Sequence, residues 1–175
     1  MKKLLRLLLA LSFCAPLFAV KIEDRYVMKA FEGGQIYFIV PYEIPAADAK
    51  DKPLLADVTY LTNADSVTMN ISVRTPDELL ADSVAIFAGE RLPIPDYETF
   101  FIERDGKLWL HRYSLRYPLD TFKHIYACPE PFTLYIYTHA RTLRYAVTDK
   151  AWPKEQEWMN QILHIIDTNR RLYRH

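Results

Sequence analysis

Rows of aromatic and histidine side chains are the part of this sequence with the clearest capacity to bind a ligand. In residues 105–118, DGKLWLHRYSLRYP, the alternation of a β-strand places rings and an imidazole on one face. Residues 132–139, FTLYIYTH, repeat this pattern. Rings with a polar edge can stack against sugars or line a cleft for a small molecule. The candidate binding residues are Trp109, His111, Tyr113, Tyr135, Tyr137 and His139.

The same side chains are also suited to a hydrophobic core. Burial of Tyr and Trp stabilises a fold by about 25 cal/mol per Å² of apolar surface. We therefore interpret the two rows mainly as core, with a ligand site as the alternative. A ligand site would require the rows to share one sheet face and form an aromatic floor beside Arg112 or Arg116. Exposure of Trp109, Tyr113 and Tyr137 in one concave patch would favour it.

The histidines show no pattern typical of a metal site or a catalytic site. Neither the one-turn spacing of a helical zinc motif nor a His-x-His pair occurs. We therefore expect no metal and assign no catalytic residue. A hydrolase with a dispersed site is a further alternative, which needs two of His111, His124 and His139 near a carboxylate in one pocket.

Motifs for nucleophilic catalysis and nucleotide binding are also missing from the sequence. No Gly-x-Ser-x-Gly elbow is found. The four glycines all occur where turns are expected, which leaves none for a phosphate-binding loop. We therefore expect no cofactor.

The N-terminal segment has the three-part pattern of a secretory signal peptide over residues 1–19. Basic residues come first, an apolar run extends from Leu7 to about Ala19, and a polar sequence follows. The run is too short to cross a bilayer, which takes about 20 apolar residues. We do not expect lipid attachment at Cys14, because Phe13 occupies a position where a small residue is needed. The sequence therefore predicts export to the periplasm or the medium.

Removal of the signal peptide changes the net charge and the cysteine content. Three basic residues and no acidic residue are lost, so the net charge falls from zero to about minus three. Such a surface does not favour nucleic acid or an anionic membrane. Cys128 is then the one remaining cysteine, which excludes a disulfide within the chain. We interpret it as a buried apolar side chain, with a reactive thiol as the alternative.

The remaining residues, 20–175, predict a single exported domain dominated by antiparallel strands. Turn residues recur about every dozen positions, as in all-β domains. The loop Asp105-Gly106 predicts a hairpin that pairs Ile102 with Trp109. Apolar residues occupy both of its faces, so the hairpin either lies centrally in the sheet or has one face against the core and the other beneath a helix or loop. Residues 77–82 could form one helical turn, and residues 119–127 fit either a helix or a loop. The other strands are expected at residues 25–31, 35–43, 57–63, 66–74, 83–88, 132–139 and 143–148.

A long amphipathic helix is predicted for residues 153–172. Apolar residues recur at helical spacing, Pro153 suits the first turn, and Arg170 and Arg171 suit the last. Such a helix must pack on another element, and Trp158 should be shielded. The fold class is therefore α+β and mainly antiparallel β, with about eight strands in a sandwich or partly open barrel and one C-terminal helix packed on it.

The expected function follows from the predicted export and from the absence of catalytic and nucleotide-binding motifs in the sequence. We expect an exported, non-catalytic interaction module whose partner is another envelope or secreted protein. The alternative is a binding module for a carbohydrate or a small apolar ligand that uses an aromatic sheet face. A nucleic-acid partner and a membrane span in the mature chain are not expected.

Overall fold

The computed structural model describes residues 22–47, 53–64, 66–93 and 96–173. The predicted signal peptide, residues 1–19, lies outside the described residues and stays a prediction. The described elements are a 3-10 helix η2 (Ile22–Arg25), strands β1 (Tyr26–Phe31), β2 (Gly34–Ile44), β3 (Leu54–Leu61), β4 (Ser66–Thr75), β5 (Ala81–Ala88), β6 (Glu90–Arg91), β7 (Asp96–Asp105), β8 (Leu108–Pro118), β9 (Thr133–Thr138) and β10 (Thr142–Ala146), and helices α2 (Leu119–Ala127) and α3 (Trp152–Tyr173).

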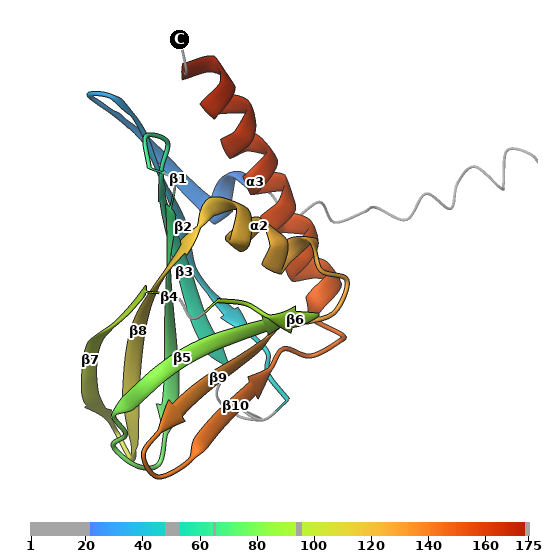
Figure 1. The fold of residues 1–175 in the computed structure, drawn as a ribbon. Coiled ribbons are helices and arrows are strands. Elements are labelled where there is room, and N and C mark those ends of the chain that lie inside the picture. The colour runs from blue at the N-terminus through green and yellow to red at the C-terminus, as the bar shows by residue number, and fades with distance from the viewer. Residues whose placement is uncertain (1–21, 48–52, 65, 94–95, 174–175) are drawn as a thin grey trace, which may run out of the picture.

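The strands form two antiparallel sheets. The larger sheet has six strands in the order β1-β2-β3-β4-β8-β7, and the smaller has the order β10-β9-β5-β6. In Figure 1, the small sheet and both helices lie on the same side of the twisted large sheet. The predicted α+β class is confirmed, and the arrangement is sandwich-like and not a closed barrel.

One hydrophobic cluster joins the inner faces of both sheets to the two helices. Strand β4 alternates as predicted, with Val67, Met69 and Ile71 buried at every second position. The predicted C-terminal helix is confirmed as α3, and Trp158 is buried as expected. Trp152 is also buried, in the first turn of α3. The buried side chains further along recur three or four positions apart, which places them on one face of the helix; they are Met159, Ile162, Leu163 and Ile166.

Residues 119–127, which the sequence left open, form helix α2. Its buried side chains Leu119, Phe122, Ile125 and Tyr126 lie on one face. The first turn has no side-chain cap, since Pro118 precedes the helix. Packing of this face therefore stabilises the short helix where capping does not.

The hairpin after β7 differs from the predicted register. Asp105 pairs with Leu108, and Trp109 lies opposite Arg104, where the sequence predicted Ile102. The loop residues are thus Gly106 and Lys107. Gly106 has a φ of +63°, and a hairpin turn with glycine at its first position accommodates this without strain. Between Phe101 and Asp105 the shift is two positions, so these side chains keep their predicted faces. From Thr99 back to Asp96 the shift is one position, which places Thr99 opposite Tyr113 and on its face.

Strand β7 is an edge strand, whereas β8 lies inside the sheet between β4 and β7, so the predicted central position is wrong for β7 alone. Its register shifts between Thr99 and Phe101, where Phe100 forms a bulge and is 61% exposed. The apolar residues on both faces of β7 therefore do not indicate two covering layers.

The predicted helical turn at residues 77–82 does not form. The Thr75 hydroxyl donates to the carbonyl of Asp77, Arg141 binds the Asp77 carboxylate, and β5 already begins at Ala81.

Candidate functional site

The row on β8 lies in the core. His111 is fully buried, and Tyr113 and Tyr117 are 1% exposed. Trp109, near the hairpin end, is half-buried, and the Arg104 guanidinium lies 4.9 Å from the centre of its ring. These residues therefore pack the inside of the large sheet and offer no open face to a ligand.

His111 is a polar group in an apolar environment. Its Nε2 lies 2.8 Å from Thr75 Oγ1, and that hydroxyl donates to the carbonyl of Asp77. The other ring nitrogen, Nδ1, has no hydrogen-bond partner among the described residues. Burial lowers the pKa of His111 from the ordinary value of 6.5, although nearby backbone carbonyls oppose this shift.

We expect His111 to make the stability fall in mild acid. Its neutral form is favoured in the folded state, whereas the unfolded chain takes up a proton near pH 6.5. Below that pH the unfolded state binds more protons, so the free energy of unfolding declines as the pH falls. Urea unfolding at several pH values between about 7.5 and 5.5 measures the slope. His111→Gln should reduce the slope of the free energy of unfolding against pH, whereas His124→Gln, at an exposed histidine, is the matched control and should keep the slope. Equal slopes in the wild type and both variants would contradict the role assigned to His111.

The row on β9 lies on the outer face of the small sheet. Tyr135 and Tyr137 are half-buried, and their rings stack with centroids 6.1 Å apart. Phe87 on β5 packs 4.8 Å from Tyr135, and the Arg91 guanidinium lies 6.0 Å from the Phe87 ring. His139 is exposed in the turn after β9. The two predicted rows thus lie on different sheets and do not form one aromatic floor.

A second apolar area lies on the outer face of the large sheet, at the β1 edge. Val27 lies opposite Phe38 and Lys29 opposite Ile36 in the β1–β2 register. Val27, Phe31 and Phe38 are exposed at 45%, 38% and 39%. We call this area the β1–β2 apolar surface, and its residues are Val27, Phe31, Ile36, Phe38 and Leu61, which lies opposite Ile36 on β3.

The centre of the same outer face is polar. Arg112 Nη2 pairs with Asp57 Oδ2 at 2.5 Å, and its Nη1 donates to Ser72 Oγ. Asn70 Nδ2 donates to the other oxygen of Asp57 at 2.7 Å. These polar side chains bind one another and fill the centre of the outer face. The β1–β2 apolar surface is therefore confined to the edge of the sheet.

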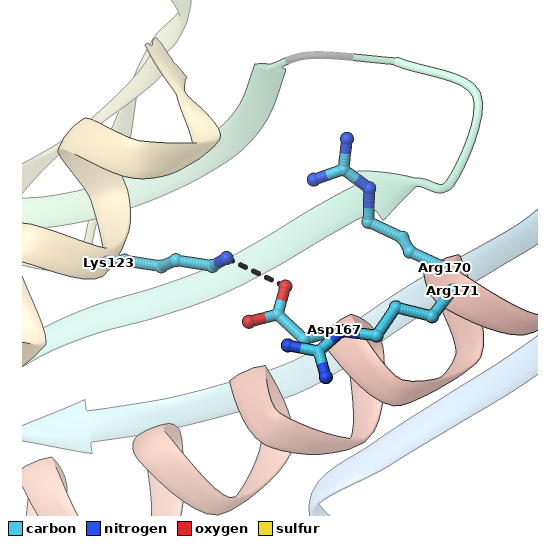
Figure 2. Close-up of a pocket in the computed structure, with 4 residues that line it drawn as sticks. All are labelled: Lys123, Asp167, Arg170 and Arg171. Carbon is cyan, nitrogen blue, oxygen red and sulfur yellow. Dashed lines mark hydrogen bonds and ion pairs between the residues drawn. The ribbon is translucent and has the colours of Figure 1, made fainter. Parts of the chain in front are cut away.

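A charged pocket of about 180 Å³ lies between α2 and α3. Figure 2 shows Lys123 reaching from α2 to Asp167 on α3, with Nζ and Oδ1 2.7 Å apart. Arg170 lies with its guanidinium 5.9 Å from the Tyr60 ring, and Arg171 completes the lining. The Lys123–Asp167 ion pair joins α2 to α3. We therefore interpret the pocket as part of the contact between these two helices.

A second pocket, of about 350 Å³, lies where β5 meets the end of α2. Cys128 and His124 line it together with Glu90, and His124 Nε2 lies 3.9 Å from Glu90 Oε1. Cys128 is 9% exposed, in keeping with its interpretation as a buried apolar side chain. Neither His111 nor His139 lines this pocket.

Sequence reasoning missed the β1–β2 apolar surface and the contribution of Phe87 and Arg91. A signal for the first was present, because YVMKAF at residues 26–31 has apolar residues at both odd and even positions. That pattern fits either a buried strand or an edge strand with exposed apolar residues. The position of a strand within its sheet separates the two cases, and it is not encoded locally.

Within the part of the chain that the structure describes, no group of three His, Cys, Asp or Glu side chains could hold a metal ion. None of the described helices is long and apolar enough to cross a membrane. No protein-family model matches the chain, and no curated protein matches it.

Proposed function

We propose that this protein is exported and acts as a non-catalytic module that binds another envelope or secreted protein through the β1–β2 apolar surface. The observation that carries the proposal is the exposure of Val27, Phe31 and Phe38 on the outer face of the large sheet, opposite the side on which the small sheet and the helices lie (Figure 1). Contiguous apolar surface of this kind marks interaction sites on soluble proteins, since leaving it in water opposes stability.

The opposite edge of the sheet provides a comparison. Strand β7 also exposes apolar side chains, Phe100 and Phe101, but it carries a bulge and the charged residues Glu98 and Glu103. Bulges and charges are the usual protection of an edge strand against association. Strand β1 has no bulge in its pairing with β2 and a single charge, Lys29. The two edges therefore differ in the way expected if only β1 meets a partner.

The proposal is tested by site-specific photocrosslinking in the native cell. A photoreactive phenylalanine analogue at position 31 or 38 should give one discrete adduct with another exported protein, and Val27→Asp should abolish it. Leu80 is the matched control, because it is 73% exposed and lies outside the β1–β2 apolar surface. Equal adducts at positions 31 and 80, or adducts that Val27→Asp leaves unchanged, would contradict the proposal.

A carbohydrate-binding function is the second candidate, and the outer row of the small sheet favours it. The rings of Tyr135 and Tyr137 are near-parallel, with 14° between their planes, and form an aromatic platform that Phe87 borders at a tilt of 59°. The Arg91 guanidinium lies beyond Phe87. Successive rings at this spacing suit stacking against sugar rings, while the tyrosine hydroxyls can bond to sugar hydroxyls.

Titration with neutral hexasaccharides of glucose and of N-acetylglucosamine tests this candidate. The ring resonances of Tyr135 and Tyr137 should shift at millimolar sugar, while those of the buried Tyr113 should not. Tyr137→Ala should weaken binding about tenfold, because covering the apolar face of one ring contributes roughly 1.5 kcal/mol. Absence of shifts in both tyrosines would exclude the platform as a site for these sugars.

A further inference from the structure

We propose that the partner adds an extended strand to the free edge of β1, and that this strand places an acidic residue opposite Lys29 between two apolar residues. The inference rests on the proposed function, because it specifies the chemistry of the partner at the same surface. It is carried by the edge position of β1, by the side chains along it and by the single charge at its middle.

The backbone of β1 has one free side among the described elements. Strand β1 is the terminal strand of the large sheet and pairs along its whole length with β2, from Tyr26 opposite Ile39 to Phe31 opposite Gly34. In an antiparallel pair, alternate residues direct their N–H and C=O groups to the neighbouring strand. The remaining groups of β1 point away from the sheet, over about 20 Å of strand. This edge is long enough to accept an extended segment by backbone hydrogen bonds.

The side chains of β1 define what that segment should carry. Val27, Lys29 and Phe31 share the outer face, because they are two positions apart. Lys29 is exposed and forms no ion pair with any described residue. In an antiparallel pair, directly opposed residues on one face contact each other, and opposite charges stabilise the pairing. The complementary strand therefore has Asp or Glu opposite Lys29, with apolar residues two positions to either side.

A second copy of the chain fits this edge less well. Two β1 strands can pair around a two-fold axis in two registers of equal overlap, one with Lys29 opposite Lys29 and one with Met28 opposite Met28. The first register is destabilised by like charges, and the second places Lys29 opposite Val27 with no opposite charge. Charge complementarity thus favours a different protein as the partner, and self-association is an outcome that the test can detect.

Two synthetic peptides provide the test. One is the seven-residue strand Thr-Val-Thr-Glu-Thr-Val-Thr, in which Glu has Val two positions to either side, and the other differs only by Lys at the centre. We titrate each into the mature protein and follow the backbone amides by NMR. The Glu peptide should shift the amides of β1 and bind about tenfold more tightly than the Lys peptide. Lys29→Glu should reverse this order, whereas Lys107→Glu in the exposed β7–β8 turn should leave it unchanged.

Three results would overturn strand addition. They are equal affinity of the two peptides, shifts confined to residues outside β1, or a dimer in sedimentation experiments whose β1 amides are protected without peptide. The crosslinking result separates these failures from failure of the proposed function. If position 31 still crosslinks to an exported protein while the peptides do not bind, the surface has a partner that docks without adding a strand. If neither is observed, both proposals fail.

Discussion

Replacement of Trp152 by Ala is expected to lower the free energy of unfolding by about 3–5 kcal/mol. Trp152 begins α3 and is 2% exposed, with its ring 5.6 Å from Tyr126 on α2 and 5.7 Å from Phe132. Its Nε1 donates to the carbonyl of Cys128 at 3.2 Å. The substitution leaves a cavity where α3, α2 and the start of β9 meet and removes that hydrogen bond. Urea unfolding monitored by circular dichroism measures the loss.

Trp109→Ala is the matched control for this substitution. Trp109 is half-buried near the β7–β8 turn and is contacted by the exposed Arg104. Because solvent can reach the space that its ring leaves, we expect a loss of at most about 1 kcal/mol. Similar losses in the free energy of unfolding for the two variants would contradict the conclusion that Trp152 anchors α3 in the core.

The second large effect is expected at the buried pair of Tyr42 and Tyr126. Their hydroxyl oxygens lie 2.9 Å apart, and the two residues are 4% and 1% exposed. Tyr126→Phe removes one hydroxyl and leaves the Tyr42 hydroxyl in the core without this partner. We expect a loss of about 1–3 kcal/mol, because a buried unsatisfied polar group keeps its full desolvation penalty. Burial also raises the pKa of both hydroxyls, so the pair stays neutral at physiological pH.

The double variant Tyr42→Phe/Tyr126→Phe makes this prediction specific. With both hydroxyls gone, no polar group is left unsatisfied, and the stability should return to within about 1 kcal/mol of the wild type. The same urea titrations on the four proteins give the coupling energy. If the losses of the two single variants simply add in the double variant, the hydroxyls do not act as a pair.

Local patterns were sufficient to predict the elements whose burial is periodic. Strand β4 alternates between apolar and polar residues, and α3 has apolar residues at helical spacing, so each pattern identifies one buried face. The hairpin of β1 and β2 follows from two glycines between apolar runs, and Gly33 has the positive φ, +94°, that the turn uses. These features depend on neighbours in sequence.

Features that depend on the sheet as a whole could not be predicted. The order of strands places β8 inside the large sheet and β9 in the small one. The aromatic rows on these two strands have the same sequence pattern but differ in burial. His111 and Tyr113 are buried, whereas Tyr135 and Tyr137 lie on the outer face and are half-buried. The apolar residues on both faces of β7 suggested a covered strand, but β7 lies at an edge of the large sheet, as β1 does at the other.

Hydrogen–deuterium exchange of the isolated mature protein is the most direct test of the account, which holds that β8 lies in the core and that β1 is an open edge. The amides of residues 111–117 should exchange slowest, near the rate set by global unfolding. Those of residues 26–31 whose N–H groups point away from β2 should exchange at least about a hundredfold faster, because they have no hydrogen-bond partner in the sheet and are open to solvent. Protection of all β1 amides to the level of β8 would show that the edge is already closed and would contradict the proposed interface.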